Sequence, residues 1–318
     1  MAVTLNDCQL YQHYRYDRAS IYFICDALHN SLILRTNRNH SLPNTLRILI
    51  TLRFLATGSF LSVISDIFNV HQSTVSRIIN EIVSALVNLA PLFLNFPSGQ
   101  TAQAVKRSFY DLGGFPGVLG AVDCCHIRIQ APKSESKQSY ICRKGYPSIN
   151  VQAVADTNYM FLNIVARWTG SVNDSRIFRN SGLCSEFETG VHSGYLLGDS
   201  GYGSKHFFMT PFLKPITAAQ KRYNIAHKKT RVVVEQMFGQ WKRRFHCLHA
   251  EIRLPNPETI CQVITACAVL HNIAKLRNLP DFGEEDTEAD YEEDDKSQDD
   301  RDAQGQASRN FIVMQYFS

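Results

Sequence analysis

Apolar and polar positions follow two different patterns along the chain. Between residues 44 and 89, apolar residues recur every three or four positions, which is the spacing of amphipathic helices. We expect helices at about residues 44–56, 60–69 and 73–89. Further on, short apolar runs bounded by glycine, proline and other turn residues predict strands. The pattern indicates a helical N-terminal region followed by a region that mixes strands and helices.

The second and third predicted helices are joined by a tight turn, as in a helix-turn-helix. The third helix has an apolar stripe and leaves polar residues near its start, including Ser73 and Thr74, toward solvent. Such side chains can reach base edges in the major groove. Only Arg77 adds positive charge there, whereas DNA affinity depends mainly on phosphate neutralisation. Sequence-specific DNA binding and a helical packing or dimer contact therefore both remain open.

Two predicted strands end at aspartates. Residues 117–122 are an apolar run that leads into Asp123, and residues 195–198 lead in the same way into Asp199, which is followed by glycines. An ionised carboxylate at the edge of a core is costly unless it is hydrogen-bonded, paired or bound to a metal. We therefore expect each aspartate to have a charged or polar partner in the fold.

Three further acids have an ordinary structural explanation when each is taken singly. Asp156 lies between two β-rich runs, where it is typical of a hairpin turn. Asp174 comes where a helix should begin, the usual place for a cap or dipole partner. Glu235 lies one position off the apolar stripe of a long helix that ends near Phe245, although the part before His227 could be loop.

Asp123, Asp199 and Glu235 together could serve one chemical function. Carboxylates are hard oxygen ligands suited to Mg²⁺ or Mn²⁺, and paired ions of this kind cleave phosphodiester bonds. The predicted helix also carries basic residues that could hold a DNA backbone. These are Lys228, Arg231, Lys242, Arg243 and Arg244.

The charge is distributed unevenly along the chain. Residues 1–280 contain 30 basic and 16 acidic residues, a net charge of +14, whereas residues 281–318 contain 13 acidic and 3 basic residues. We expect the latter segment to be an acidic, disordered tail. It would serve solubility, or it would mimic nucleic acid and compete for the basic surface.

The composition is that of a globular protein, with 44% hydrophobic and 19% charged residues among 318. The apolar stretch at residues 46–70 is interrupted by charges, so we expect no membrane span. The N-terminus lacks the features of a secretory signal, which predicts an intracellular protein. The nine cysteines have no Cys-x-x-Cys spacing, which argues against a disulfide framework or a zinc site.

Five motifs, in this order, resemble those of the Harbinger transposases and the nucleases derived from them. They are Gly-Ala-Val-Asp-Cys-Cys-His-Ile, Gly-Ser-Val-Asn-Asp-Ser-Arg-Ile, Leu-Gly-Asp-Ser-Gly-Tyr, Val-Glu-Gln-Met-Phe-Gly-Gln-Trp-Lys-Arg-Arg-Phe and Val-Leu-His-Asn-Ile. The resemblance covers most of residues 45–280. Many relatives have Gly-Thr where this chain has Cys124 and Cys125, and small side chains are retained.

The resemblance implies an α/β fold with an RNase H-like DDE nuclease core, in which a mixed sheet has flanking helices. In it Asp123, Asp199 and Glu235 would form the DDE triad, and Asp174 would be a further metal ligand. The expected domains are a helical region at residues 1–95, with the helix-turn-helix at about 44–89, the nuclease domain at 96–280 and the tail at 281–318. The resemblance also implies a Myb-like DNA-binding partner that recruits the protein to DNA and into the nucleus.

Two functions from different classes follow. The first is a transposase-derived, divalent-metal-dependent DNA endonuclease of the nucleus and cytoplasm. The second is a host DNA-binding or scaffold protein that acts with the Myb-like partner and does not use its catalytic residues. The oligomeric state is open, and a homo-oligomer is one option.

Overall fold

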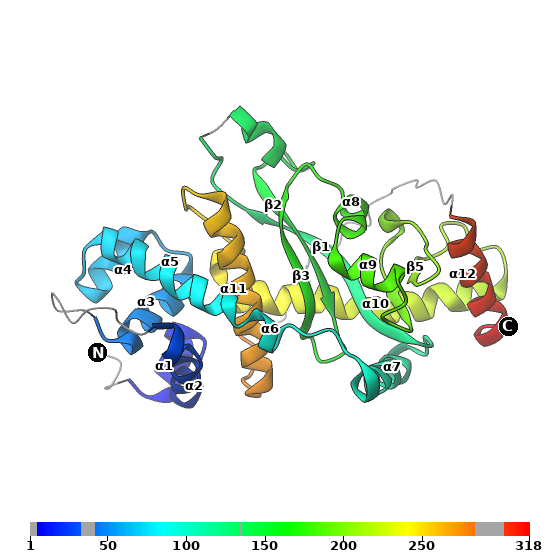
Figure 1. Ribbon diagram of the computed structural model, residues 1–318, viewed down its shortest axis with the longest axis horizontal. Helices are drawn as coiled ribbons and strands as arrows, with labels where there is room; N and C mark the ends of the chain where they lie inside the picture. Colours follow the sequence, from blue (N-terminus) through cyan, green and yellow to red (C-terminus); the bar gives the residue numbers. More distant parts are fainter. Residues whose placement is uncertain (1–4, 33–41, 134, 284–301) are drawn as a thin grey trace. The chain divides into compact units, whose positions relative to one another are not determined.

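The computed structural model describes residues 5–32, 42–133, 135–283 and 302–318, which divide between two compact units (Figure 1). Unit 1 comprises residues 1–94, 127–149 and 240–285, and unit 2 comprises residues 95–126, 150–239 and 286–318. The chain therefore crosses between the units several times. The predicted nuclease domain of residues 96–280 is distributed over both of them.

Unit 1 is largely helical. Its helices are α1 (Asp7–Tyr14), α2 (Arg18–Leu28), η2 (His29–Leu32), α3 (Asn44–Thr57), α4 (Leu61–Phe68), α5 (Gln72–Asn88), α6 (Ala90–Phe93), η3 (Glu135–Tyr140), η5 (His246–Leu248) and α11 (Pro257–Leu276). The apolar stripe predicted for α5 is buried, and α5 packs against α3 and α11. The three helices expected between residues 44 and 89 are present, and each of them buries at least one apolar residue.

Helices α4 and α5 contact each other and are joined by the tight turn that the sequence predicted. Asn69 ends α4 in the left-handed conformation, at a φ of 51°, and His71 accepts a hydrogen bond from the backbone N–H of Ser73 at 3.2 Å. Asparagine tolerates this conformation better than most residues. The turn between the helices therefore needs only a few residues.

Helix α11 is long and apolar enough to span a membrane by length and composition alone. Two thirds of its apolar window is buried in the structure, and α11 packs against α5 and α6. Burial of this kind is typical of the core helix of a globular unit, so its apolar composition is explained by packing within unit 1.

Unit 2 is built on a five-stranded sheet with the strand order β3-β2-β1-β4-β5. The strands are β1 (Val118–Arg128), β2 (Ser148–Ala155), β3 (Phe161–Thr169), β4 (Tyr195–Leu197) and β5 (Phe208–Met209). Strand β4 runs parallel to both β1 and β5. Asp156 lies in the turn between β2 and β3, where its Oδ1 accepts hydrogen bonds from the backbone N–H groups of Asn158 and Met160. Its predicted role as a turn residue is confirmed.

The helices of this unit are α7 (Gly99–Gly113), α8 (Asp174–Arg179), α9 (Gly182–Glu188), η4 (Ser200–Tyr202), α10 (Ala218–Arg244) and α12 (Ala303–Tyr316); the last residues of α10 belong to unit 1. One apolar cluster joins the sheet to α8 and α9, and within it Phe178 packs edge-on against Phe208 at 4.7 Å between ring centres. Phe161 of β3 packs against Phe238 of α10. Helix α10 is continuous from Ala218, so the part before His227 is helical.

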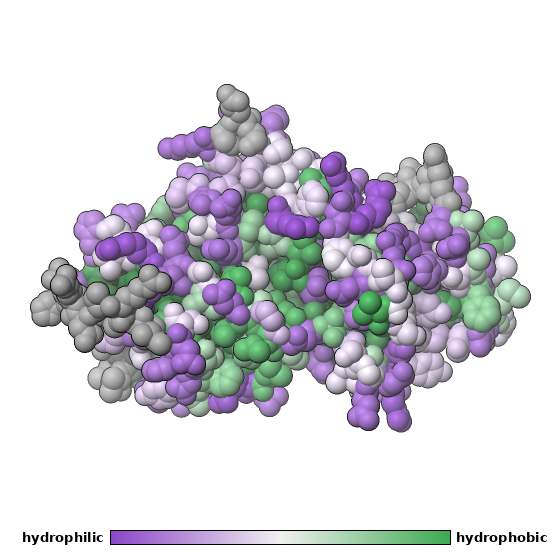
Figure 2. All heavy atoms as spheres, in the orientation of Figure 1, coloured by the Kyte–Doolittle hydropathy of each residue, from purple (hydrophilic) through white to green (hydrophobic). Residues whose placement is uncertain are grey.

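The expectation of a tail at residues 281–318 is wrong for its last part, because residues 303–316 form helix α12. Arg309 is buried, and its guanidinium carbon lies 4.2 Å from the centre of the Phe212 ring. Arg222 of α10 donates hydrogen bonds to the carbonyl of Phe317. Phe311 and Met314 are exposed, and Figure 2 shows apolar side chains over α12. The acidic residues 284–301 lie outside the described residues.

Candidate active site

Strands β1 and β4 bring the first two predicted aspartates to the same level of the sheet. The strands are parallel, and their last paired positions are Ala121 and Leu197. Asp123 follows two residues later within β1, and Asp199 follows two residues later, just past the end of β4. Because the strands run in the same direction, the two carboxylates lie at one edge of the pairing. The apolar runs that precede both residues therefore determine where the acids are placed.

Helix α10 supplies the third acid together with a basic residue. Arg231 lies one helical turn before Glu235 and donates hydrogen bonds both to Asp123 Oδ2, at 2.9 Å, and to Glu235 Oε1. The side chains of these three residues are only about one fifth exposed, at 21%, 19% and 17% for Arg231, Asp123 and Glu235. One guanidinium thus connects the acid of the central strand to the acid of the helix.

Backbone groups fix both aspartates. Asp123 Oδ1 accepts a hydrogen bond from the backbone N–H of Cys124 at 2.9 Å. Asp199 is the N-cap of η4 and accepts a hydrogen bond from the backbone N–H of Gly201 at 3.0 Å. A capping aspartate keeps a defined rotamer because its carboxylate satisfies a backbone donor. The glycine-rich sequence after Asp199 therefore orients this carboxylate.

The charges of the cluster act on one another. Burial raises the pKa of Asp123 to about 7, Arg231 opposes that rise, and the carboxylates of Asp199 and Glu235 add to it. Burial by itself lowers the pKa of Arg231, but the three acids outweigh this effect and raise the pKa above its usual value. Several carboxylates in one partly buried site repel one another unless a cation lies among them. In this structure Arg231 provides that cation.

Asp174 lies at the start of α8, as predicted, and is held by a side-chain amide. Its Oδ1 accepts a hydrogen bond from Asn150 Nδ2 at 2.9 Å. Its charge helps to raise the pKa of both the Cys124 thiol and the Tyr202 hydroxyl, after the larger effect of burial. The Cys124 sulfur and the Tyr202 oxygen are 3.2 Å apart. The charges of Asp123 and Asp199 also help to raise the pKa of Tyr202, so Asp174 and these two acids act on the same hydroxyl.

The basic residues predicted to hold DNA do not share one environment. Lys228 is exposed, whereas Lys242 and Arg243 are half-buried. Arg244 is 1% exposed and donates hydrogen bonds to the carbonyls of Arg15 and Pro280. The prediction that Arg244 contacts the DNA backbone is wrong, because its guanidinium is buried and hydrogen-bonded in the interior of unit 1.

Two other predicted DNA contacts also hydrogen-bond within the protein. Arg231 faces Asp123 and Glu235 instead of an open surface, so its expected role on the DNA backbone is corrected to that of an internal counter-ion. Arg77 is exposed on α5, and its guanidinium donates hydrogen bonds to the carbonyl of Ser73 at 3.4 Å and to the hydroxyl of Thr74 at 3.3 Å. Arg77 keeps its charge at the surface of the helix-turn-helix.

The donor set fits a divalent cation in its chemistry. Asp123, Asp199 and Glu235 offer hard carboxylate oxygens, and their mutual repulsion favours a bound cation. Among the residues that the structure describes, however, no three His, Cys, Asp or Glu side chains are already gathered around a common point. Arg231 bonds to one oxygen of two of the acids, so a metal that binds all three would compete with this guanidinium.

Sequence reasoning missed three contributors to this region. Asn150 contacts Asp174 and had no motif signal beyond its place in an apolar run. Tyr202 contacts Cys124; it ends the motif Leu-Gly-Asp-Ser-Gly-Tyr, but the motif was interpreted only through Asp199. For Arg231, the four-residue spacing to Glu235 was a usable signal for an ion pair. That spacing did not reveal that the same guanidinium also reaches Asp123.

The chain is similar to proteins that are named as nucleases. A family model described as DDE superfamily endonuclease matches residues 122–272. The chain is 37% identical to "Putative nuclease HARBI1" of Bos taurus over 274 residues, which cover 85% of this chain and 78% of that protein. It is 36% identical to the protein of the same name from Homo sapiens, with the same coverage.

A plant relative is more distant. "Protein ALP1-like" of Arabidopsis thaliana is 30% identical over 243 residues, which cover 71% of this chain and 59% of that protein. No solved structure gives a significant match.

Proposed function

The chain belongs to the family of Harbinger-derived DDE nucleases, and on that premise we propose that it is a divalent-metal-dependent DNA endonuclease. Asp123, Asp199 and Glu235 are its catalytic residues and metal ligands, and Asp174 is a further ligand. The observation that carries the proposal is the placement of Asp123 and Asp199 two residues past the same pairing of β1 and β4, with Arg231 joining Asp123 to Glu235.

The reaction is hydrolysis of a phosphodiester bond. A water oxygen forms a bond to phosphorus, the bond from phosphorus to the leaving oxygen breaks, and a proton from water ends on the leaving oxygen. Mg²⁺ or Mn²⁺ bound by these carboxylates supplies activation of the water and stabilisation of the leaving oxygen. The protein holds its carboxylates in fixed positions, since the N–H groups of Cys124 and Gly201 orient Asp123 and Asp199.

Exposed Lys228 lies two turns before Glu235 on α10 and holds the DNA backbone near the acids. Lys242 and Arg243 are half-buried. They contact DNA only through the solvent-exposed part of each side chain. A positively charged side chain beside a carboxylate site also counters the repulsion between the acids and the phosphates of the substrate.

The direct test combines cleavage with metal binding. Purified wild-type protein should nick supercoiled plasmid in Mn²⁺, and calorimetry should detect Mn²⁺ binding. Asp123→Asn and Glu235→Gln should lose both properties, whereas Asp111→Asn, which changes an exposed acid of α7, should lose neither. A wild-type protein that binds no Mn²⁺ would remove the basis of the proposal.

The alternative is a DNA-binding or scaffold protein that does not use its acids for catalysis. The ion pairs of Arg231 favour this possibility, because they satisfy Asp123 and Glu235 without a metal. A cellular phenotype that survives Asp123→Asn and Glu235→Gln but is lost with Lys228→Gln would support the alternative. Loss of the phenotype in all three variants would support the nuclease.

We also propose a Myb-like DNA-binding partner and residence in the nucleus and cytoplasm, both on the family resemblance. The helix-turn-helix carries little charge, so recruitment by a second DNA-binding protein would supply affinity that this surface lacks. Fluorescence microscopy with and without the co-expressed partner tests both points. A distribution that does not respond to the partner would contradict the recruitment. Sedimentation of the purified chain would decide whether it forms a homo-oligomer.

A further inference from the structure

The loop that joins β1 to β2, residues 129–147, is strongly basic. It contains four basic residues and one acidic residue, and we call it the β1–β2 loop. Lys133, Lys137, Arg143 and Lys144 are all exposed. Positive charge concentrated in this way creates a local potential that attracts polyanions. None of these residues belongs to the acidic cluster described above.

A tight turn presents two of the four cations. The backbone N–H of Gly145 donates to the carbonyl of Cys142 at 2.9 Å, so Arg143 and Lys144 occupy the two central positions of a four-residue turn. Gly145 has a φ of 80°, which glycine adopts without strain. The N–H of Cys142 donates to the carbonyl of Tyr146 at 3.0 Å, and Cys142 is buried. The turn therefore has an anchored base and a cationic tip.

The base of the β1–β2 loop is fixed within unit 1. Ile129 forms a parallel bridge with Ile252, and the N–H of Ile252 donates to the carbonyl of Arg128 at 3.0 Å. Tyr140 lies near Cys261 and Glu258 of α11; its pKa is raised by burial and, to a smaller extent, by these two groups. A loop that is tied down at both ends presents its cations with less entropic loss on binding.

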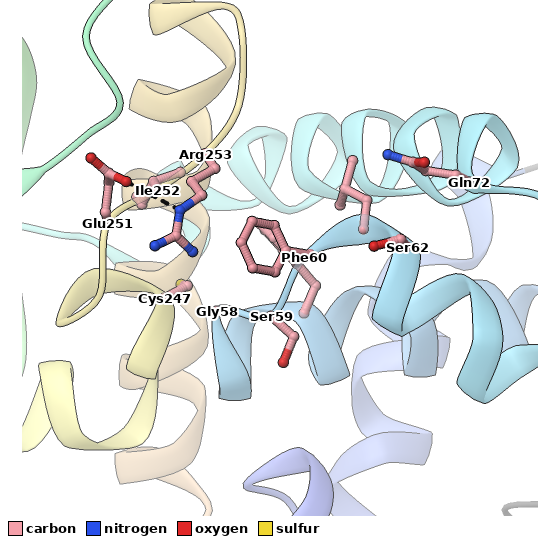
Figure 3. A pocket seen from close by; sticks show the side chains of 11 residues that line it. Gly58, Ser59, Phe60, Ser62, Gln72, Cys247, Glu251, Ile252 and Arg253 are labelled. Carbon is pink, nitrogen blue, oxygen red and sulfur yellow. Dashed lines mark hydrogen bonds and ion pairs between the residues drawn. The ribbon is translucent and has the colours of Figure 1, made fainter.

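The segment that anchors this loop also contacts the helix-turn-helix. Ile252 and Arg253 line a pocket together with Phe60, just before α4, and Gln72, at the start of α5 (Figure 3). The guanidinium carbon of Arg253 lies 4.6 Å from the centre of the Phe60 ring. The β1–β2 loop and the pair α4–α5 are therefore attached to the same short segment of unit 1.

The two elements have complementary properties for binding DNA. The front of α5 offers polar side chains that can reach base edges but adds only one cation, Arg77. The β1–β2 loop offers cations for the phosphates. Phosphate contacts give affinity and position the protein, whereas contacts with base edges give sequence preference.

We propose that the β1–β2 loop is a phosphate-binding surface for duplex DNA that supplies the positive charge missing from the helix-turn-helix. The inference rests on the proposed function, because that function makes DNA the substrate. It assigns the loop cations to DNA contacts separate from those of Lys228. Each phosphate neutralised on B-DNA contributes about 0.9 to the slope of log affinity against log salt. Two loop cations should therefore contribute about 2 to that slope.

The test measures DNA binding without catalysis. Fluorescence anisotropy of a labelled 30-base-pair duplex is followed in EDTA with the full chain, at several KCl concentrations. Two double variants, Arg143→Gln with Lys144→Gln and Lys133→Gln with Lys137→Gln, each remove two charges from the loop. Lys214→Gln with Lys221→Gln removes two charges from exposed lysines of unit 2 and is the matched control. Thermal melting shows whether each variant is folded.

Each folded loop variant should reduce the salt slope by about 2, whereas the control should keep the wild-type slope. The inference would be overturned if the loop variants kept the wild-type slope. It would also be overturned if the control variant lost as much of the slope as the loop variants do. The outcome is independent of the nuclease. Wild-type protein that depends on the loop for binding but does not nick plasmid in Mn²⁺ leaves this inference intact and contradicts the proposed function. Wild-type protein that nicks plasmid, with loop variants that keep the wild-type salt slope, would support the proposed function and contradict this inference.

Discussion

Replacement of Arg231 by methionine should destabilise the protein in a way that depends on pH. The substitution keeps a long side chain and removes the guanidinium that contacts Asp123 Oδ2 and Glu235 Oε1. Removal of one partner from a buried ion pair costs about 3 to 5 kcal/mol. These side chains are about one fifth exposed, and Asp123 can take up a proton, so we expect a loss of about 2 to 3 kcal/mol at pH 8.5.

The sign of the pH dependence follows from Asp123. Its folded pKa of about 7 exceeds the ordinary value of 3.8, so its contribution to stability is fully present below about pH 4 and is lost as the pH rises through 7. That difference in pKa corresponds to about 4 kcal/mol. Arg231 opposes the rise, so without it the carboxyl should keep its proton to a higher pH. The loss caused by Arg231→Met should therefore be smaller at pH 5.5 than at pH 8.5.

Urea unfolding followed by circular dichroism at both pH values measures this loss. A double-mutant cycle with Asp123→Asn isolates the coupling, because a neutral amide at position 123 no longer needs the guanidinium. The cost of Arg231→Met should fall by about 1 to 2 kcal/mol in the Asp123→Asn background, the coupling expected of a directly contacting pair. A cost that is the same at both pH values and additive with Asp123→Asn would refute the counter-ion role.

Three further predictions concern other parts of the chain. Gly198→Ala should destabilise the protein by about 1 to 3 kcal/mol, since the Cβ of the alanine would lie 2.4 Å from the Phe208 ring. It should also reduce cleavage, because position 198 is next to Asp199. Urea unfolding measures the first effect and plasmid nicking the second. Arg244→Leu should lower the melting temperature but leave the salt dependence of DNA binding unchanged, because its guanidinium bonds only within unit 1. Deletion of residues 303–318 should lower the melting temperature, because it exposes the surface of β5 that α12 covers. Amide hydrogen exchange at Met209 of β5 should then increase.

The positions of the main acids could be predicted from the sequence because local patterns determine them. Asp123 and Asp199 each end a short apolar run, and such a run is buried wherever the sheet forms. Neighbouring parallel strands then bring the two residues together. The helical stripe of α10 likewise placed Glu235 at the boundary of the core, since its position follows from a spacing of 3.6 residues per turn.

The orientation of the arginines could not be predicted in the same way. Arg231 and Arg244 both lie on a basic helical surface by sequence, yet one faces the acids and the other is buried among backbone carbonyls. Their partners, Asp123 for the first and Arg15 and Pro280 for the second, are remote in the chain. Local spacing contains no information about such contacts. Helix α12 was missed for a related reason, because the acidic residues before it dominate the composition of the segment.

Arg231 also affects metal binding, because it contacts two of the proposed metal ligands. A guanidinium and a divalent ion are both attracted to Asp123 and Glu235, so each reduces the affinity of the acids for the other. In the metal-free protein the arginine limits the repulsion among the carboxylates and so stabilises the fold. A divalent ion held by Asp123, Asp199 and Glu235 would therefore compete with the guanidinium for two of its acids. The same residue would thus stabilise the metal-free protein and lower its affinity for the metal.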